Sequence, residues 1–575
     1  MPDYDLIIVG GTVVDGLRTP RFLADLGIKN GKVAHMGDLK TATAQRKVDA
    51  SGAIVAPGFV DLHTHYDAQI FWDPHCSVSS WHGVTSIAIG NCGFGFAPCS
   101  VDRRDRAMRA MTRNEAIPYE AMKIGMKWDW VTFPDFLDSI QRMPKAVNVV
   151  SSVPLTPIYT WVMGWDQAKL RRPTEQELQE MCRLVREGMD AGAVGWSAQV
   201  LGPDSVQRDY DASPMVTDLM PDEEILRFAR ILRDKNEGYI ELAYQGTGEE
   251  NRMIDRSTTD LFEKVAAESQ RPVLYQAVVA NIDNLNQHRQ RLQWLERCNS
   301  KGLRVFGQAD IRRTPFQLTF EDWNLFDQSP TWRMVTLGSP AERKTKMQNP
   351  QLRAAMRAEW DAGVKPEGAI RGSVAGLIIE RVQNPSLEKY VGLSVANIAK
   401  LESKHVVDAL LDIVVADDLR TEIIGPKGRD SAEGAAEILN SPYCVAGLSD
   451  GGAHVKFSPG GVFTTEILAW LVRDEQLVSL EEAHHKLSYL PAIVGGIRDR
   501  GFIQVGAPAD IVVYDLQELQ AGPVKVVRDL PGGDWRRIQE PKGYRWILVN
   551  GEITIANGRP TRKMPGRLLR HGVAA

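Results

Sequence analysis

Two histidines separated by a single residue stand in the stretch FVDLHTHYD, residues 59–67. The apolar run before them is typical of a buried β-strand that ends at this point. Because alternate residues of a strand face the same side, the imidazoles of His63 and His65 are expected to point in one direction. Such a pair on a rigid strand end can chelate one divalent metal ion. Two structural histidines are the competing interpretation, because an H-x-H motif alone is weakly specific.

Two other apolar runs also end in residues that could bind a metal. Cys92 follows TSIAIGN and precedes Gly93, so a soft thiolate ligand could lie in a tight turn there. Asp450 follows CVAGLS and precedes two glycines, and its carboxylate could bind the metal or accept a proton from an attacking water. A small buried cysteine and a turn-forming aspartate are the structural alternatives.

The chain from about residue 58 to 490 alternates helices with strands. Thr174 and Glu177 stand in capping-box positions before apolar residues at helical spacing, and Gly192 precedes the strand AVGWSAQV. Similar units recur as far as LRVFGQAD at residues 303–310. This α/β pattern predicts parallel strands with crossover helices, and its length favours a (β/α)8 TIM barrel over an open sheet. Barrels carry their catalytic groups at the carboxyl ends of the strands, where the candidate residues lie.

Both chain ends differ from the middle, with short β-rich runs separated by glycine. Examples are YDLIIVGGTVVDG near the amino end and WILVNGEITIANG near the carboxyl end. Since chain ends often lie close together, we expect residues 1–57 and 496–575 to form one composite β-sandwich domain around a barrel of residues 58–495. Residues 310–440 are helical, charged and too long for one connection, which predicts a helical insertion within this range.

The composition excludes several classes of partner. The 575-residue chain is 43% hydrophobic and 25% charged, as in ordinary globular proteins, and carries a formal net charge of −5. Nucleic acids and anionic membranes usually select a clear basic excess, so neither is an expected partner. The six cysteines form no CxxC pair, which argues against a disulfide framework. Without a signal peptide or a membrane-length apolar stretch, a cytoplasmic location is expected, and a homo-oligomer stays open.

Several stretches resemble the amidohydrolase superfamily, and in particular its D-aminoacylase (N-acyl-D-amino-acid deacylase) branch. They are PGFVDLHTHYD, GVTSIAIGNCGFGFAP, GLSDGGAHV and the terminal runs DLIIVGGTVVDG and DRGFIQVGAPADIVVYDL. The resemblance covers nearly the whole chain and implies a split β-sandwich beside the barrel. It also implies that His63, His65 and Asp450 are metal ligands or catalytic. By the same likeness, Cys92 matches the family's metal-binding cysteine.

The fifth and sixth predicted strands depart from that family pattern. The family supplies one histidine from each, whereas YIELAYQGTG and VLYQAVVAN contain none, and Ala243 and Ala277 stand at the expected positions. The fourth strand also lacks the lysine of related binuclear branches. Two nitrogens, a thiolate and a carboxylate remain. This set predicts one zinc ion per chain and leaves a second metal open.

Other residues near the strand ends are candidates for further contacts. Four of them could orient the substrate: Tyr244, Gln245, Gln276 and His454. Two more histidines follow the first strand and could approach the site: His75 and His82. The histidines in predicted helices are expected to be solvated or packing residues: His288, His484 and His485.

These residues favour a metal-dependent hydrolase that cleaves the C–N bond of a small-molecule amide, such as an N-acyl amino acid. The metal would lower the pKa of its bound water toward about 7, while Asp450 takes the water proton and returns it to the leaving nitrogen. A catalytically degenerate barrel that only binds a ligand is one alternative, and the missing histidines favour it. A metal-dependent lyase or isomerase is another, since a fold does not determine its reaction.

Overall fold

The central strands are parallel and belong to two sheets. The computed structural model describes residues 2–203, 205, 207–243, 256–280, 284–313, 315–321, 329–363, 374–425 and 431–572. One sheet has three parallel strands: β6 (Phe59–Asp61), β7 (Val84–Ile89) and β8 (Asn148–Ser151). The other has six parallel strands, in the order β17 (Cys444–Ala446), β13 (Val305–Ala309), β12 (Val273–Val278), β11 (Tyr239–Ala243), β10 (Gly195–Gln199) and β9 (Val153–Pro154).

Backbone hydrogen bonds connect the two sheets at both of their edges. At one edge, the N–H of Val194, just before β10, donates to the carbonyl of Ser151 in β8 at 2.9 Å. At the other edge, the N–H of His65 donates to the carbonyl of Gly451 at 2.7 Å, beside a parallel bridge between Thr64 and Gly451. The segments that follow β6 and β17 therefore lie side by side.

Helices alternate with these strands, as the sequence pattern predicts. Helix α7 (Glu175–Asp190) begins at the predicted capping box of Thr174 and Glu177 and buries its apolar stripe. Strand β10 follows it. The corresponding helices before the next strands are α8 (Asp222–Lys235), α9 (Arg256–Ser269), α10 (Leu285–Ser300) and α16 (Ala432–Asn440). Among the described helices, none is both long enough and apolar enough to cross a membrane.

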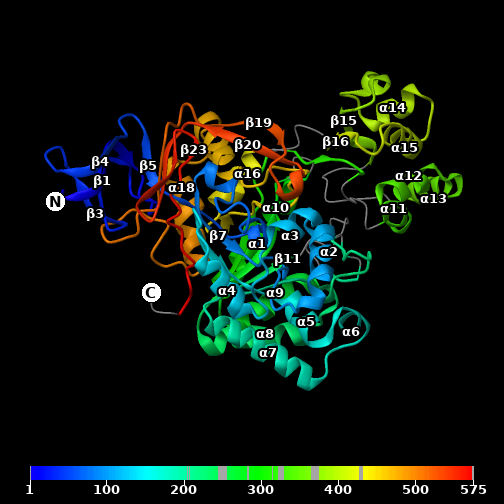
Figure 1. Cartoon of the computed structure of the whole chain (residues 1–575), viewed down its shortest axis with the longest axis horizontal. Helices are drawn as coiled ribbons and strands as arrows, with labels where there is room; N and C mark the ends of the chain where they lie inside the picture. The colour runs from blue at the N-terminus through cyan, green and yellow to red at the C-terminus, as the bar shows by residue number, and fades with distance from the viewer. Residues whose placement is uncertain are drawn as a thin grey trace.

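A separate nine-stranded sheet combines strands from both ends of the chain (Figure 1). Its contact between the two ends is the antiparallel pair of β5 and β18. An apolar cluster of its own, which includes Ile8, Leu26 and Ile511, lies against it. The strands are β1 (Tyr4–Val13), β2 (Phe22–Lys29), β3 (Lys32–Gly37), β4 (Ala44–Asp49), β5 (Ile54–Pro57), β18 (Ile511–Tyr514), β21 (Tyr544–Val549), β22 (Glu552–Ala556) and β23 (Arg559–Pro560).

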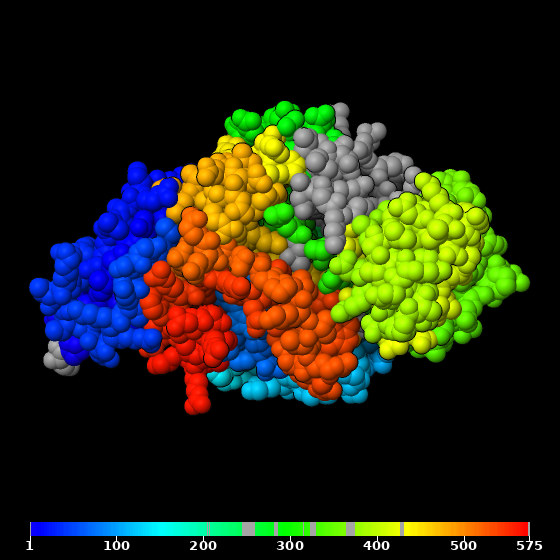
Figure 2. Space-filling model, turned by 90° about the horizontal axis from the view of Figure 1, so that it is seen from above, coloured from blue at the N-terminus to red at the C-terminus, as the bar shows by residue number. Residues whose placement is uncertain are grey.

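A helical lobe lies at the end of the molecule opposite the amino-terminal strands (Figures 1 and 2). It has a small antiparallel sheet of β14 (Gln317–Leu318), β16 (Glu422–Ile424) and β15 (Ile378–Arg381). Its helices are α11 (Pro330–Val335), α12 (Pro340–Gln348), α13 (Pro350–Asp361), α14 (Val395–Leu401) and α15 (Val406–Ala416). Phe320 and Trp332 are buried in its own apolar core. The lobe thus has a packing core distinct from that of the parallel strands.

Candidate metal centre

Three of the predicted ligands converge in a buried cluster. His63 and His65 follow β6, and Cys92 follows β7. One donor atom from each of the three side chains lies within 4.8 Å of the others. Within the described parts of the chain, they form the only group of three or more histidine, cysteine or acidic side chains with this spacing. The parallel strands position them, because adjacent strands that run in one direction end at the same edge.

Asp450 joins this cluster from the segment that follows β17. Its Oδ1 lies 3.5 Å from Nε2 of His63 and 4.0 Å from Nε2 of His65. Its other oxygen, Oδ2, accepts a hydrogen bond from Nη1 of Arg312 at 3.1 Å. Burial alone would raise the pKa of Asp450, but Arg312 and the nearby histidines lower it below its usual range. Asp450 is therefore held as a carboxylate with one oxygen directed at the histidines.

The two histidines are neutral, which is the form that binds a metal. Burial lowers the pKa of His63, and burial lowers the pKa of His65 to about 3. The ring of His63 is also oriented, because its Nδ1 lies 3.2 Å from Oε1 of Gln308 on β13. With the proton on Nδ1 donated to Gln308, the lone pair of Nε2 faces Cys92 and Asp450. Gln308 was not among the predicted residues.

Two buried glutamates also reach the cluster and were missed from the sequence. Glu241, on β11, accepts a hydrogen bond from the Cys92 N–H at 2.7 Å, and its other oxygen lies 3.8 Å from Nδ1 of His63. Glu115, just after α2 (Arg104–Asn114), places Oε2 3.5 Å from Nε2 of His65. Burial raises the pKa of Glu241 to about 8 and that of Glu115 well above its usual range.

The remaining predicted residues fall into three groups. Gln276 and His454 lie near the cluster, because Oε1 of Gln276 is 3.6 Å from Sγ of Cys92 and Nε2 of His454 is 3.4 Å from Oε2 of Glu115. Tyr244 and Gln245 lie outside the described residues.

His82 does not reach the cluster, because its ring nitrogens contact the Thr465 hydroxyl and the carbonyl of Gln539. Ala243 ends β11 as a buried methyl group.

Three residues of the site have a left-handed backbone conformation, which also occurs elsewhere in the chain. Cys92, Asp450 and His454 are non-glycine residues with φ values of 55°, 51° and 52°. This left-handed region costs free energy for a residue with a Cβ, and such residues concentrate at functional sites. Each of the three directs its side chain to the cluster. The surrounding structure therefore holds these residues in a conformation that they would not adopt in an unconstrained turn.

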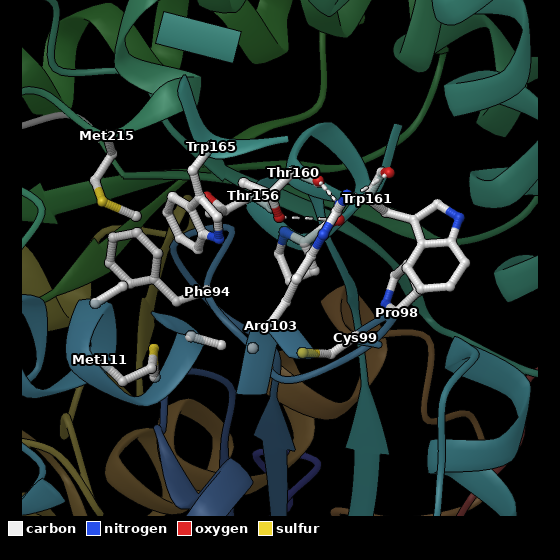
Figure 3. A pocket seen from close by; sticks show the side chains of 14 residues that line it. Phe94, Pro98, Cys99, Arg103, Met111, Thr156, Thr160, Trp161, Trp165 and Met215 are labelled. Atoms are coloured by element: carbon white, nitrogen blue, oxygen red, sulfur yellow. Dashed lines mark hydrogen bonds between the residues drawn. The ribbon is translucent and has the colours of Figure 1, made fainter. Parts of the chain in front are cut away.

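A small, partly open apolar cavity is lined by residues close in sequence to Cys92 and Glu115 (Figure 3). Its lining includes Phe94, whose N–H donates to the carbonyl of Asn91, and Met111, whose carbonyl accepts the N–H of Glu115. The guanidinium of Arg103 donates hydrogen bonds to the carbonyls of Thr160 and Trp161 (Figure 3). Aromatic and sulfur-containing side chains form much of the remaining wall: Phe94, Cys99, Met111, Trp161, Trp165 and Met215.

Comparison with known proteins shows the family and agrees with this fold. The chain matches the family described as "Amidohydrolase family" (Amidohydro_3) over residues 46–561 and therefore belongs to that family. The N-acyl-D-glutamate deacylase of Alcaligenes xylosoxydans xylosoxydans is 26% identical over 98% of this chain and 96% of that protein.

Two solved structures share the fold over nearly their whole length. D-aminoacylase, described with a binuclear metal centre, has a TM-score of 0.67 at 22% identity and covers 99% of this chain and 100% of its own. N-acyl-D-glutamate deacylase from Bordetella bronchiseptica, solved with zinc and a phosphonate inhibitor, has a TM-score of 0.64 at 21% identity, with 99% of both chains covered. The mixed α/β fold of this protein is therefore the fold of these amidohydrolases.

Proposed function

We propose that this protein is a zinc-dependent amidohydrolase that cleaves the amide bond of an N-acyl amino acid or a related small amide. The observation that carries the proposal is the buried convergence of His63, His65, Cys92 and Asp450 in a member of the amidohydrolase family. Its relatives include a deacylase of N-acyl-D-glutamate. The amide bond is thus the expected target, and the D configuration is the first to test.

We also propose the finer architecture that supports such a site. The parallel strands from β6 to β17, with β8 and β9 counted as one because only residue 152 separates them, would form a closed (β/α)8 barrel within residues 58–495, which the hydrogen bonds at both sheet edges support. Residues 1–57 and 496–575 would form the composite β-sandwich domain, and the lobe would be an insertion within residues 310–440. The reaction then takes place at the carboxyl ends of the barrel strands.

The donor set fits one zinc ion. Neutral imidazoles, a thiolate and a carboxylate are ligands that zinc prefers; His63, His65 and Cys92 are buried, and the side chain of Asp450 is 16% exposed. His63, His65, Cys92 and Asp450 would hold the ion. When bound, zinc acts as a Lewis acid on the scissile carbonyl and lowers the pKa of a water molecule toward about 7. Whether a second ion binds stays an open question, because Ala243 and Ala277 offer no ligand atom in their side chains.

The protein's own residues would supply proton transfer and orientation. Asp450 Oδ1 accepts the proton of the attacking water and returns it to the leaving nitrogen. Arg312 fixes the opposite oxygen of that carboxylate, so Oδ1 keeps its direction. Gln308 fixes the ring of His63 in the same way. Gln276 and His454 are proposed to orient the substrate, together with Tyr244 and Gln245 beyond the described end of β11.

The apolar cavity is proposed to receive the acyl group of the substrate. Two of its lining residues support this, because Phe94 follows Cys92 closely in the chain and Met111 accepts the N–H of Glu115. Arg103 donates hydrogen bonds to two carbonyls of the wall. Because most of the lining side chains are apolar, an apolar acyl chain is favoured.

Metal content and product analysis together test this function. Protein purified without chelators is expected to contain about one zinc per chain and to hydrolyse N-acyl-D-amino acids. Hydrolysis in oxygen-18 water labels the carboxylic acid product, whereas a lyase or isomerase leaves its product unlabelled. A chain that takes up no zinc, even when zinc is supplied, would instead be the ligand-binding protein that the missing histidines suggest.

A further inference from the structure

We propose that Glu115 is an additional metal ligand, supplied by a segment outside the parallel strands. This inference rests on the proposed function, because it concerns the same ion. It answers the question raised by Ala243 and Ala277, which leave two expected ligand positions without donors. A carboxylate from the segment after α2 would be a fifth protein ligand beside His63, His65, Cys92 and Asp450, and zinc can expand to five-coordinate.

The distances around the cluster support this assignment. Two donors of one tetrahedral zinc lie roughly 3.3–3.6 Å apart, given metal–donor bonds of about 2.0–2.3 Å. Nε2 of His65 lies 3.5 Å from Oε2 of Glu115. The separation is the same as that between Nε2 of His63 and Oδ1 of Asp450, at 3.5 Å, and close to that between His63 and Sγ of Cys92, at 3.4 Å. Glu115 therefore occupies the position of a ligand relative to His65.

Burial and charge give an independent reason for a cation at this place. The side chain of Glu115 is 1% exposed, and its Oε1 has no hydrogen-bond partner. Its ion-pair contacts within the described chain are with His65 and His454. Ionising a buried carboxyl group without a cation beside it is strongly unfavourable. A divalent ion between Glu115 and His65 would remove that penalty.

Glu241 is a useful contrast, because it is equally buried but differently placed. One of its oxygens accepts the Cys92 N–H, and the other faces Nδ1 of His63, the ring nitrogen that also contacts Gln308. Glu241 thus lies behind two ligands and orients them. Glu115 instead approaches Nε2 of His65, the ring nitrogen that lies 4.0 Å from Oδ1 of Asp450. Only Glu115 shares the side on which the donors converge.

The backbone fixes Glu115 to the segment that carries Asp450. The N–H of His454 donates to the carbonyl of Glu115 at 2.7 Å, and Nε2 of His454 lies 3.4 Å from Oε2 of Glu115. The N–H of Glu115 itself completes the last turn of α2 through the carbonyl of Met111. This double attachment places the carboxylate without any contribution from β11 or β12.

The test compares the full-length protein with Glu115→Gln and with Glu224→Gln. Glu224 is another buried carboxylate, hydrogen-bonded to Tyr159, and serves as the matched control. Zinc affinity is measured by competition with a chromophoric chelator, and the coordination is followed by the absorption spectrum of the cobalt-substituted protein. Glu115→Gln should weaken zinc binding by about tenfold or more and change the cobalt spectrum. Glu224→Gln should change neither.

The stability of the zinc-free proteins separates a ligand from a structural residue. Without metal, Glu115→Gln should be about as stable as the unaltered protein, because an amide of the same size replaces a buried carboxyl group that has no cation beside it. Unchanged zinc affinity, or lower zinc-free stability with an unchanged cobalt spectrum, would overturn the assignment. If Glu115→Gln does not fold, Glu115→Asp provides the same comparison, because its shorter carboxylate withdraws from His65. Failure of the proposed function looks different: the unaltered protein would bind zinc through Glu115 and still hydrolyse no amide.

Discussion

Two pairs of buried histidines have similar burial and different surroundings. His63 and His65 lie at the candidate metal centre, whereas His82 and His484 lie where the parallel strands meet the carboxyl-terminal strands. Burial lowers the pKa of all four, so all four are neutral. Neither burial nor a displaced pKa therefore distinguishes a functional histidine from a structural one in this protein.

The partners of the ring nitrogens make the distinction. His82 places one nitrogen 2.7 Å from the Thr465 hydroxyl and the other 2.9 Å from the Gln539 carbonyl, so both are satisfied by neutral groups. His484 contacts the Tyr514 hydroxyl at 2.7 Å. His63 and His65 instead direct Nε2 at a thiol and at carboxylates. Neutral nitrogens that face potential anions without a cation are typical of a metal site whose ion is supplied from solution.

The largest expected effect comes from removing one histidine of each pair. His63→Ala should lose nearly all bound zinc and all hydrolytic activity, since it removes a donor at the centre of the cluster. His82→Ala should keep its zinc but lose about 3 kcal/mol of stability, because it opens a buried cavity and removes the hydrogen bonds to the Thr465 hydroxyl and the Gln539 carbonyl. Elemental analysis and urea denaturation of both variants check this. Loss of zinc from His82→Ala would contradict the assignment of His82 as a structural histidine.

Asp450→Asn is expected to have the next largest effect. An amide cannot accept the proton of the attacking water, so turnover should fall by about 10²–10⁴-fold. The contact with Arg312 can persist through the amide oxygen, so the fold should be retained. Steady-state kinetics at matched zinc content measure the loss. Turnover within a few-fold of the unaltered enzyme would exclude Asp450 as the proton acceptor and leave it a ligand only.

Sequence reasoning reached the metal centre where strand ends carry the donors. His63, Cys92 and Asp450 each follow an apolar run, and parallel strands bring such ends together. Glu241 could have been found in the same way, because it stands two residues before Ala243 and so shares a strand face with it. Glu115 had no such signal. It follows a helix, and only its tertiary contact with His454 brings it to the cluster.

The fold was predictable for a related reason. Helix α7 and strand β10 were evident from a capping box, an apolar stripe and a glycine stop, all of which are local signals. The pairing of β5 with β18 joins residues more than 400 positions apart. Its only signal in the sequence is that both chain ends contain short β-rich runs separated by glycine. The internal core of the lobe was not visible either, because Phe320 and Trp332 are equally compatible with lining a pocket and with packing.

The two structural histidines, His82 and His484, should make the free energy of unfolding depend on pH. Burial lowers the pKa of His82 to about 4 and that of His484 to about 3, below the ordinary value of 6.5. The unfolded chain therefore binds more protons below pH 6.5, and stability present at pH 7 is lost as the pH falls. From pH 7 to 5 the loss is about 2 kcal/mol for each histidine. His484→Gln should reduce that loss by about 2 kcal/mol.

Urea denaturation of zinc-free protein at the two pH values measures this difference. Zinc-free protein is used so that proton competition with the metal does not contribute. His63 and His65 are present in both proteins and cancel in the comparison. If His484→Gln lost stability as steeply as the unaltered protein, His484 would not be a neutral packing residue, and the contrast between the two pairs would fail.

The smallest expected effect comes from narrowing the apolar cavity, which should change the preference for the acyl chain of the substrate and leave metal binding unchanged. Ala110, on α2, is buried in the cavity wall, and Ala110→Leu would project a larger apolar side chain into that space. The value of kcat/KM for a long-chain N-acyl amino acid should fall about tenfold, because the leucine side chain would exclude a few methylene groups of the acyl chain from the cavity. The value for the N-acetyl substrate should stay nearly constant, as should the zinc content. Equal losses for both substrates would assign Ala110 to the support of α2 and Glu115, whereas no loss for either would move the acyl group out of this cavity.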